Sequence, residues 1–395
     1  MRGAVPLTGP IAFCEAESRL VYCYDSEQLW VEPWGKNSLR VRCTRQAEMP
    51  REDWALLPPS GCSAEVVKRG NQCVWLHNGK ISACLTVSGK LSFHDRNGRT
   101  LLKEYVRNRK DLNSAHCSAL AIDAREFSPN MGSDDRLSVR FEPQDTRERL
   151  FGMGQYQQSC LDLKGTVLEL AHRNSQTSVP FVLSSLGYGF LWNNPAIGRA
   201  TFAKNLTLWE AESTTAMDYW VTAGDTPAEI EEAYANATGK VPMMPDYAMG
   251  FWQCKLRYQT QEELLEVARG YKKRGLPISV IVVDFFHWPL QGEWKFDPTY
   301  WPDPDGMIRE LKEMGIELMV SVWPTVDYRS ENFEEMRQKG YLIHVNHGQK
   351  VSLKSLGDTL FYDATNPDAQ SYVWEKAKKN YYEKTCKSQV KFSRE

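Results

Sequence analysis

Short runs of β-branched and aromatic residues dominate the chain up to about residue 240. Several of them alternate between apolar and polar positions, which is the period-two pattern of a strand with one buried face. Turn-forming pairs such as Asn78-Gly79 and Asn97-Gly98 separate the runs. Many short strands divided by such turns predict an antiparallel β-sandwich. The clearest runs are residues 20–24, 38–42, 73–76, 81–87, 179–183, 189–192 and 219–222.

The hydrophobic pattern changes near residue 240, which is the predicted domain boundary. A helical pattern over residues 225–239 is followed by a linker that contains Pro242 and Pro245. A chain of 395 residues is also longer than one ordinary domain. We therefore expect an amino-terminal sandwich over residues 1–240 and a second domain over residues 241–395.

Strands and helices alternate in the second domain. Residues 278–283 are a nearly unbroken apolar run, as in a parallel strand that is covered on both faces. The pattern implies a parallel sheet, which is either open and doubly wound or closed into a barrel. The expected strands are residues 248–253, 278–283 and 318–323, and the expected helices are residues 260–274, 303–315, 330–340 and 366–381.

A glycine-rich phosphate-binding turn would favour the open sheet. The nearest candidate is Gly152-Met153-Gly154, which lacks a third glycine and does not open a helix. This disfavours a dinucleotide-binding fold and leaves a barrel. In barrel enzymes the chemistry lies at the carboxyl ends of the strands.

Charge and composition exclude several classes of protein. The 48 Lys and Arg residues are balanced by 50 Asp and Glu residues, so nucleic acid is not an expected partner. No apolar run approaches the roughly 20 residues of a membrane helix, and the opening residues lack the apolar core of a signal peptide, so we expect a cytoplasmic protein. None of the ten cysteines forms a Cys-x-x-Cys pair, which predicts reduced thiols, no metal site and no cofactor.

Asp284 is the sharpest candidate for a functional residue. It ends the apolar run and precedes Phe285, Phe286, His287 and Trp288. A carboxylate at a barrel mouth accepts hydrogen bonds from sugar hydroxyls, while neighbouring rings cover the apolar faces of the sugar. The alternative is a strand-end aspartate that only caps the next loop.

Several aromatic residues have two open interpretations. Trp323 follows the third strand and either contacts a ligand or closes the barrel core. Trp252 and Tyr258 follow the first strand, and each is either a ligand contact or a packing residue. His287 is either a general acid or base or, more simply, a solvated loop residue.

An ordered series of motifs runs from about residue 145 to residue 382. The motifs are Phe151-Gly152-Met153-Gly154-Gln155, Arg173-Asn174-Ser175, Trp192-Asn193-Asn194-Pro195, Gly250-Phe251-Trp252-Gln253 with Arg257-Tyr258, Val283-Asp284-Phe285-Phe286, Gly292-Glu293-Trp294 with Phe296-Asp297-Pro298, Trp301-Pro302-Asp303-Pro304, Ser321-Val322-Trp323-Pro324 and Asp363-Ala364-Thr365-Asn366-Pro367. Taken together, they resemble glycoside hydrolase family 31, which contains α-glucosidases and α-xylosidases, and in particular its bacterial α-xylosidases.

The resemblance implies a fold, a mechanism and a set of binding residues. The fold is a β-sandwich similar to galactose mutarotase, followed by the first part of a (β/α)8 barrel. The mechanism is retaining, with two carboxyl groups about 5 to 5.5 Å apart. The implied partner is an oligosaccharide or another α-glycoside, and Arg173 and Asn174 are placed on a sandwich loop that reaches over the barrel mouth. The predicted substrate-binding residues are Asp284, Phe285, Trp323, Tyr258, Arg173 and Asn174.

The resemblance ends after Tyr382. The family continues into a strand with a Trp-x-Asp motif, whose aspartate is the nucleophile, whereas residues 383–395 contain no aspartate. The segment from Asp246 onward has 150 residues, against about 250 in a whole barrel, which suggests three of the eight strands.

We therefore assign no catalytic residue to the chain and expect it to be inactive by itself. A truncated or frame-shifted gene is the simplest reason, and completion by a second chain is an alternative. Two further alternatives are a carbohydrate-binding fragment without catalysis and a chain destabilised by an open sheet edge. The preference between xylosides and glucosides and the oligomeric state do not follow from the sequence.

Overall fold

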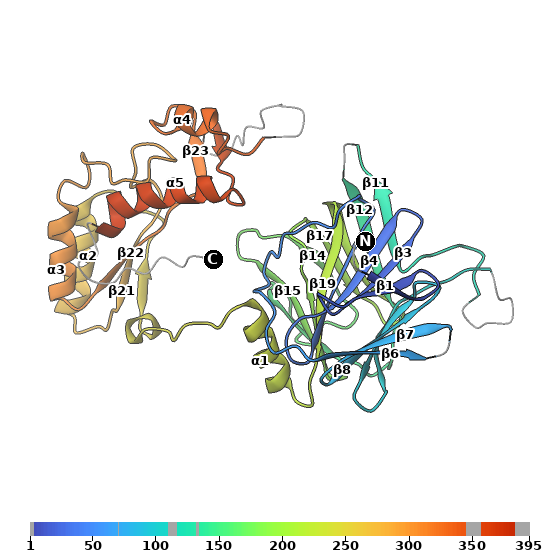
Figure 1. The fold of residues 1–395 in the computed structure, drawn as a ribbon. Coiled ribbons are helices and arrows are strands. Elements are labelled where there is room, and N and C mark those ends of the chain that lie inside the picture. Colours follow the sequence, from blue (N-terminus) through green and yellow to red (C-terminus); the bar gives the residue numbers. More distant parts are fainter. Residues whose placement is uncertain (1–3, 70, 110–116, 132–133, 345–356, 384–395) are drawn as a thin grey trace. The chain divides into compact units, whose positions relative to one another are not determined.

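The chain forms two compact units, Met1–Val241 and Pro242–Glu395 (Figure 1). The boundary between the units, after Val241, is one residue from the boundary that the sequence predicts. The linker prolines Pro242 and Pro245 follow it. The structure is a computed structural model, and the residues that it describes are 4–69, 71–109, 117–131, 134–344 and 357–383.

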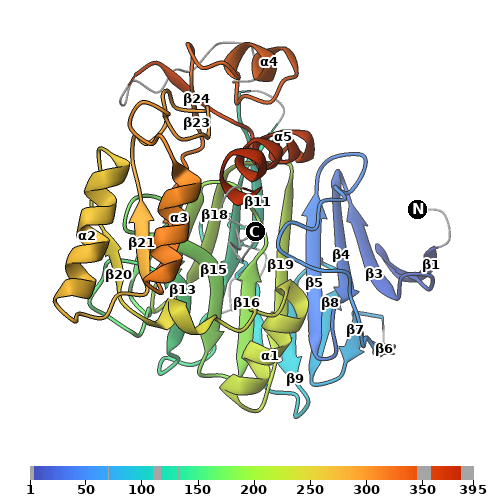
Figure 2. The same cartoon turned by 90° about the vertical axis from the view of Figure 1, so that its left-hand side faces the viewer.

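Antiparallel strands build the described part of the first unit (Figure 2). They form a nine-stranded sheet in the order β1-β2-β3-β4-β5-β19-β16-β15-β13 and two five-stranded sheets in the orders β10-β9-β8-β7-β6 and β11-β12-β18-β17-β14. The strands are β1 (Ala4–Thr8), β2 (Ile11–Cys14), β3 (Arg19–Tyr24), β4 (Glu27–Pro33), β5 (Ser38–Thr44), β6 (Ala64–Arg69), β7 (Cys73–Asn78), β8 (Ile81–Thr86), β9 (Leu91–Asp95), β10 (Thr100–Lys103), β11 (Arg125–Pro129), β12 (Asp135–Phe141), β13 (Leu150–Gln155), β14 (Val167–Leu170), β15 (Thr177–Ser184), β16 (Tyr188–Trp192), β17 (Gly198–Phe202), β18 (Thr207–Thr214) and β19 (Ala216–Ala223).

The alternating pattern of the sequence gives these strands one buried face. In β7, Val74 and Leu76 are buried, whereas Cys73, Trp75 and His77 are half-buried. The turn between β7 and β8 depends on Gly79, whose φ of +62° is in the left-handed region. A Cβ there would lie 2.2 Å from the side-chain oxygen of Asn37, so only glycine fits this predicted hairpin turn.

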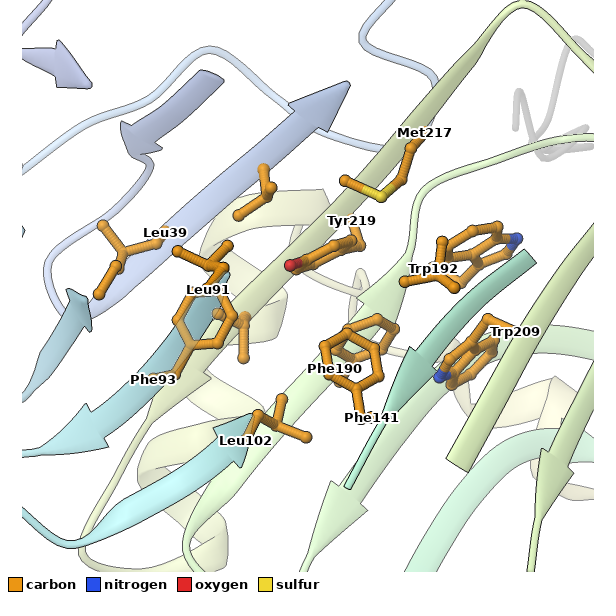
Figure 3. Close-up of a cluster of buried hydrophobic side chains, with 14 of the residues drawn as sticks. Leu39, Leu91, Phe93, Leu102, Phe141, Phe190, Trp192, Trp209, Met217 and Tyr219 are labelled. Atoms are coloured by element: carbon orange, nitrogen blue, oxygen red, sulfur yellow. The ribbon is translucent and has the colours of Figure 1, made fainter. Parts of the chain in front are cut away.

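Aromatic rings fill the centre of the sandwich (Figure 3). The Phe190 ring stacks on Trp209 at 5.0 Å and on Tyr219 at 4.9 Å between centroids. Trp192 stacks on Trp209 at 5.8 Å, and Phe141 meets Phe190 edge to face. Such pairs add about 0.5–1.5 kcal/mol each to the effect of burial, so these rings stabilise the core of the sandwich.

Helix α1 (Pro227–Thr238) closes the first unit and lies against β16 and β19 (Figure 2). Its N-cap is Thr226, whose hydroxyl accepts a hydrogen bond from the backbone N–H of Glu229 at 3.3 Å. Ile230 on its inner face is 1% exposed. The helix therefore lies within residues 225–239, where the sequence predicts a helical pattern.

A parallel sheet forms the centre of the described part of the second unit. Its strands are β20 (Trp252–Cys254), β21 (Val280–Val283) and β22 (Glu317–Val320), in that order. Ile281 and Leu318 belong to the core that this sheet shares with helices α2 (Gln261–Lys273) and α3 (Pro304–Glu313), which lie side by side in Figure 1. The strand–helix alternation of the sequence thus gives the expected sheet with helices on its surface.

The rest of the second unit differs in part from the expectation. The expected strand over residues 248–253 begins as the 3-10 helix η1 (Asp246–Met249), and the expected strand over 318–323 stops at Val320. Pro324 cannot donate a ladder hydrogen bond, and beyond it the chain pairs antiparallel with a segment that was not predicted to be a strand. The remaining elements are β23 (Thr325–Asp327), α4 (Phe333–Gln338), β24 (Thr359–Phe361), α5 (Pro367–Ala377) and the π-helix η2 (Lys378–Tyr382).

Candidate functional site

Asp284 lies directly after β21, at the carboxyl end of the parallel sheet. The four residues of β21 are buried, whereas Asp284 is half-buried. Its Oδ1 accepts a hydrogen bond from the backbone N–H of Phe285 at 2.8 Å. Among the described residues, no hydrogen bond to Oδ2 is found. One carboxylate oxygen thus caps the loop, as the simpler interpretation expected, and the other remains available for a ligand.

The backbone after Asp284 is strained. Phe285 has φ +27° and Phe286 has φ +57°, so two consecutive residues with large side chains adopt the left-handed region. Each such conformation costs of the order of 1–3 kcal/mol and persists only where the surrounding structure holds it. Strain of this kind clusters at ligand-binding sites, which gives an independent reason to place a site at this loop.

An aromatic cluster stands beside the carboxylate. The Phe285 ring lies 4.9 Å from the Trp323 ring and 4.2 Å from the Phe286 ring, between centroids. Trp323 follows β22, and its carbonyl accepts a hydrogen bond from Trp294 Nε1 at 3.0 Å. The structure therefore brings Asp284, Phe285 and Trp323 together at one end of the sheet, with half-buried rings next to a half-buried carboxylate.

Tyr258 is in the core rather than on a surface. It is 1% exposed, and its hydroxyl oxygen accepts a hydrogen bond from Gln253 Nε2 at 3.2 Å. Burial raises the pKa of this phenol. The structure thus differs from the predicted ligand contact and agrees with the alternative, packing. Trp252 remains 40% exposed.

His287 is buried, so the expectation of a solvated loop histidine is wrong. It is 0% exposed, and its Nε2 lies 2.9 Å from the Tyr381 hydroxyl in the π-helix η2. The rings of Trp288 and Phe296 pack against it at 4.6 and 5.3 Å. Burial lowers its pKa to about 3, so the imidazole is neutral at pH 7. Local sequence patterns do not reveal this burial, because the partner of His287 is 94 residues away along the chain.

Arg173 and Asn174 lie on the connection between β14 and β15 in the sandwich unit. Arg173 pairs with Gln176 in a tight turn, in which Ser175 has φ +65°. The Arg173 side chain is 62% exposed and forms an ion pair with Glu169 at 2.9 Å. Asn174 is exposed. Both residues are thus on a sandwich loop, and their contact with a sugar held at Asp284 stays a prediction.

Arg257 is a candidate that the sequence analysis quoted in a motif but did not assign. It is exposed, and its guanidinium carbon lies 6.0 Å from the centroid of the Phe286 ring. This is the outer limit of a cation–π contact. Arg257 could have been assigned from the sequence, because it stands directly before Tyr258 in the same motif.

The described parts of the chain contain neither a metal-binding cluster nor a membrane-spanning helix. No group of three or more His, Cys, Asp or Glu side chains there has an arrangement that could hold a metal ion. In the same residues, no helix combines the length and the apolar character that a membrane span requires.

Both units of the chain match models of known protein families. Residues 28–199 match the model of the glycosyl hydrolase 31 N-terminal galactose mutarotase-like domain, and residues 241–392 match that of the glycosyl hydrolases family 31 TIM-barrel domain. A family 31 glucosidase, ORF2, of Pseudescherichia vulneris is 52% identical over 377 residues, which are 93% of this chain and 71% of that protein. The chain belongs to glycoside hydrolase family 31. The predicted fold, a mutarotase-like sandwich followed by part of a barrel, is confirmed.

Two α-xylosidases are also similar to the chain, one compared by structure and one by sequence. An α-xylosidase from a soil metagenome, solved with xylose, is 54% identical with a TM-score of 0.88, and the match covers 96% of this chain and 56% of that one. Alpha-xylosidase A of Aspergillus niger is 30% identical over 396 residues, 92% of this chain and 51% of that protein. The chain thus spans about half the length of these two relatives.

Proposed function

We propose that this family-31 chain carries the sugar-binding part of an α-glycosidase that acts on α-linked xylosides or glucosides. The observation that carries the proposal is the half-buried Asp284 carboxylate at the carboxyl end of β21, beside the rings of Phe285 and Trp323. Barrel enzymes bind their substrates at this end of the strands. The similarity to α-xylosidases supports the xyloside alternative.

The proposed pocket recognises the sugar unit that is being cut. The free oxygen of Asp284 accepts hydrogen bonds from sugar hydroxyls, and such bonds to a charged acceptor are about twice as strong as those between neutral groups. The rings of Phe285 and Trp323 cover the apolar C–H faces of the sugar. Arg173 and Asn174 of the sandwich loop stay predicted substrate-binding residues. Tyr258 supports the site from the core, through its hydrogen bond with Gln253.

The proposed reaction proceeds with retention of configuration. One carboxylate attacks the anomeric carbon and forms a glycosyl ester, while a second carboxylic acid gives its proton to the departing oxygen. Water then cleaves the ester, with the second group now acting as the base. We assign neither carboxyl group to residues 1–395 and propose that these residues alone do not turn over glycosides. Residues 384–395, where the expected Trp-x-Asp motif is missing, lie outside the described part of the structure.

The proposed preference for xylose depends on Phe285 and Phe286. Xylose lacks the hydroxymethyl group of glucose, and a phenyl ring at that position crowds glucose but not xylose. Replacing either phenylalanine by isoleucine should then shift binding toward glucosides. An unchanged ratio of the two affinities in both variants would contradict this role.

Binding and turnover can be measured separately on the 395-residue chain. We expect xylose to bind with a millimolar Kd in calorimetric titration, and Asp284→Asn to weaken binding at least tenfold. Asp305→Asn, which changes an exposed aspartate in the first turn of α3, is the matched control and should bind like the parent. Equal binding by the parent and Asp284→Asn would remove the proposed pocket.

The same preparation tests the proposed inactivity. Incubation with aryl α-xylosides and aryl α-glucosides should release no aryl alcohol. Binding without release agrees with the second candidate, a carbohydrate-binding fragment, because the proposed pocket at Asp284 has no assigned nucleophile. Clear release would refute the inactivity. The cytoplasmic location stays a prediction.

A further inference from the structure

A cavity lies within the sandwich unit, and its lining includes no residue of the barrel unit. Its volume is about 910 Å³, within the range of roughly 300–1,000 Å³ that is usual for small-molecule sites. It opens where strands of all three sandwich sheets end: the β3–β4 turn, the β8–β9 turn, the segment after β10 and the start of β11. Six of its lining residues carry the argument: Tyr24, Asp25, Arg45, Glu104, Asp123 and Arg125.

Fixed polar groups form the inner part of the cavity. Arg125 is 9% exposed, and its Nε and Nη2 donate to Glu27 Oε1 and to the Gly89 carbonyl, each at 3.0 Å. Its Nη1 pairs with Glu104, which is 0% exposed and also accepts a hydrogen bond from the Leu91 backbone at 2.8 Å. These groups hold one another in place, so the polar wall is preorganised before any ligand arrives.

The outer part of the cavity offers an aromatic face and unpaired carboxylates. Tyr24 is 69% exposed at the end of β3, and Asp25 follows it with φ +54°, in the left-handed region. In the described residues, neither Asp25 nor Asp123 takes part in an ion pair, and both are exposed. The Arg45 side chain adds a cation and donates to the Phe127 carbonyl at 3.2 Å. A single exposed tyrosine is ordinary, but here the ring borders a polar cavity.

The mixture of charges restricts the chemistry of a ligand. A polyanion would meet the carboxylates of Asp25 and Asp123, and a polycation would meet the guanidinium of Arg45. A neutral molecule with many hydroxyl groups satisfies both signs, because each hydroxyl donates to a carboxylate and accepts from a cation. Its C–H faces can cover the exposed Tyr24 ring.

We propose that this cavity is an accessory site for a neutral oligosaccharide, with Tyr24 as the stacking platform and Asp25, Asp123 and Arg45 as the hydrogen-bonding groups. The site does not rest on the proposed pocket at Asp284, since all its residues belong to the sandwich unit. Such a site would let the protein bind a carbohydrate chain away from the position of the sugar unit that is cut.

The test uses the whole 395-residue chain and two neutral trisaccharides, isomaltotriose and xylotriose, in saturation-transfer NMR and calorimetry. We expect at least one of them to bind, and we expect Tyr24→Ala and Asp123→Asn each to weaken that binding at least fivefold. Tyr300→Ala is the matched control, because Tyr300 is an exposed tyrosine, at 53%, in the barrel unit. Circular dichroism should show unchanged folding in all variants, since the altered side chains are exposed.

Asp284→Asn separates this site from the pocket of the proposed function. Trisaccharide binding that survives Asp284→Asn and falls in Tyr24→Ala supports the accessory site, even if xylose binding at Asp284 fails. Binding that falls only in Asp284→Asn overturns the accessory site and leaves the proposed function standing. If the parent chain binds neither trisaccharide, the accessory site is overturned as well. The same holds if trilysine binds and its binding is weakened equally by Tyr24→Ala, because the site would then not be selective for neutral ligands.

Discussion

The buried imidazole of His287 should make the barrel unit sensitive to mild acid. The side chain is 0% exposed, and burial lowers its pKa from 6.5 to about 3. Below about pH 6.5 the unfolded chain therefore binds a proton at His287 that the folded chain does not bind until about pH 3. The unfolded state gains free energy from that proton, so the free energy of unfolding falls as the pH falls through this window.

The size of the effect follows from the two pKa values. Within the window, the free energy of unfolding falls by about 1.4 kcal/mol for each pH unit. Between pH 7 and pH 5 the loss from His287 is about 2 kcal/mol, which is a large share of a domain stability of roughly 5–15 kcal/mol. The neighbouring Tyr381 hydroxyl does not contribute, because burial raises its pKa and it stays protonated. Ordinary carboxylates begin to titrate only below about pH 5.

Hydrogen exchange measured by mass spectrometry can follow the barrel unit by itself, through peptides that cover β21 and β22. The parent chain should lose about 2 kcal/mol of protection between pH 7 and pH 5, after correction for intrinsic exchange. In His287→Phe the titrating group is gone, so this loss should disappear. The variant should also be about 1–3 kcal/mol less stable at pH 7, because the Tyr381 hydroxyl loses its buried partner.

An exposed histidine of the same unit provides the control. His344→Gln removes an imidazole that is exposed, so the acid sensitivity of the parent should remain. If the parent and His287→Phe lost the same free energy between pH 7 and pH 5, the acid sensitivity would come from other groups. The inference that His287 is neutral in the folded protein would then be refuted.

Three further changes test the packing by urea denaturation. Thr260→Ala removes the N-cap bond to the Glu263 backbone N–H, 3.2 Å long, and should cost the barrel unit about 1 kcal/mol; no change would mean that the cap is not formed. Phe190→Ala leaves a cavity in the sandwich core and should cost about 3–5 kcal/mol, and a loss below 1 kcal/mol would contradict the stacking described. Asp218→Ala leaves Arg40, which is 0% exposed, without its 2.6 Å partner and should also cost about 3–5 kcal/mol, whereas a stable variant would show that Asp53 alone suffices.

Local signals predicted the elements that depend on local chemistry. The capping residues Thr260, Asp303 and Asn366 each accept the hydrogen bond expected of an N-cap, so the starts of α2, α3 and α5 follow from the sequence. The β23–β24 pair could not be found in this way. Each of its strands has three residues, and the partners are more than 30 residues apart, so neither periodicity nor a turn motif marks them.

The candidate site shows the same division between local and distant causes. The end of an apolar strand was enough to single out Asp284, because a carboxylate at that position follows from the run before it. The contact between Phe285 and Trp323 joins two strands and needed the register of the sheet. The burial of His287 needed Tyr381, which is the last residue of the helix predicted over residues 366–381, but the sequence did not show that this end packs against His287 as a π-helix.

The points at which local reasoning failed lie close to the site itself. Phe285 and Phe286 have left-handed backbones that their side chains disfavour, and His287 is a titratable group enclosed by rings. A fold selected only for stability has no reason to concentrate strain and a buried imidazole in one loop, since both cost free energy. Conflicts between local preference and global structure are expected at functional sites, where the geometry of a ligand overrides the preference of the chain. The strain next to Asp284 is therefore an argument for its role that does not depend on any relative of this protein.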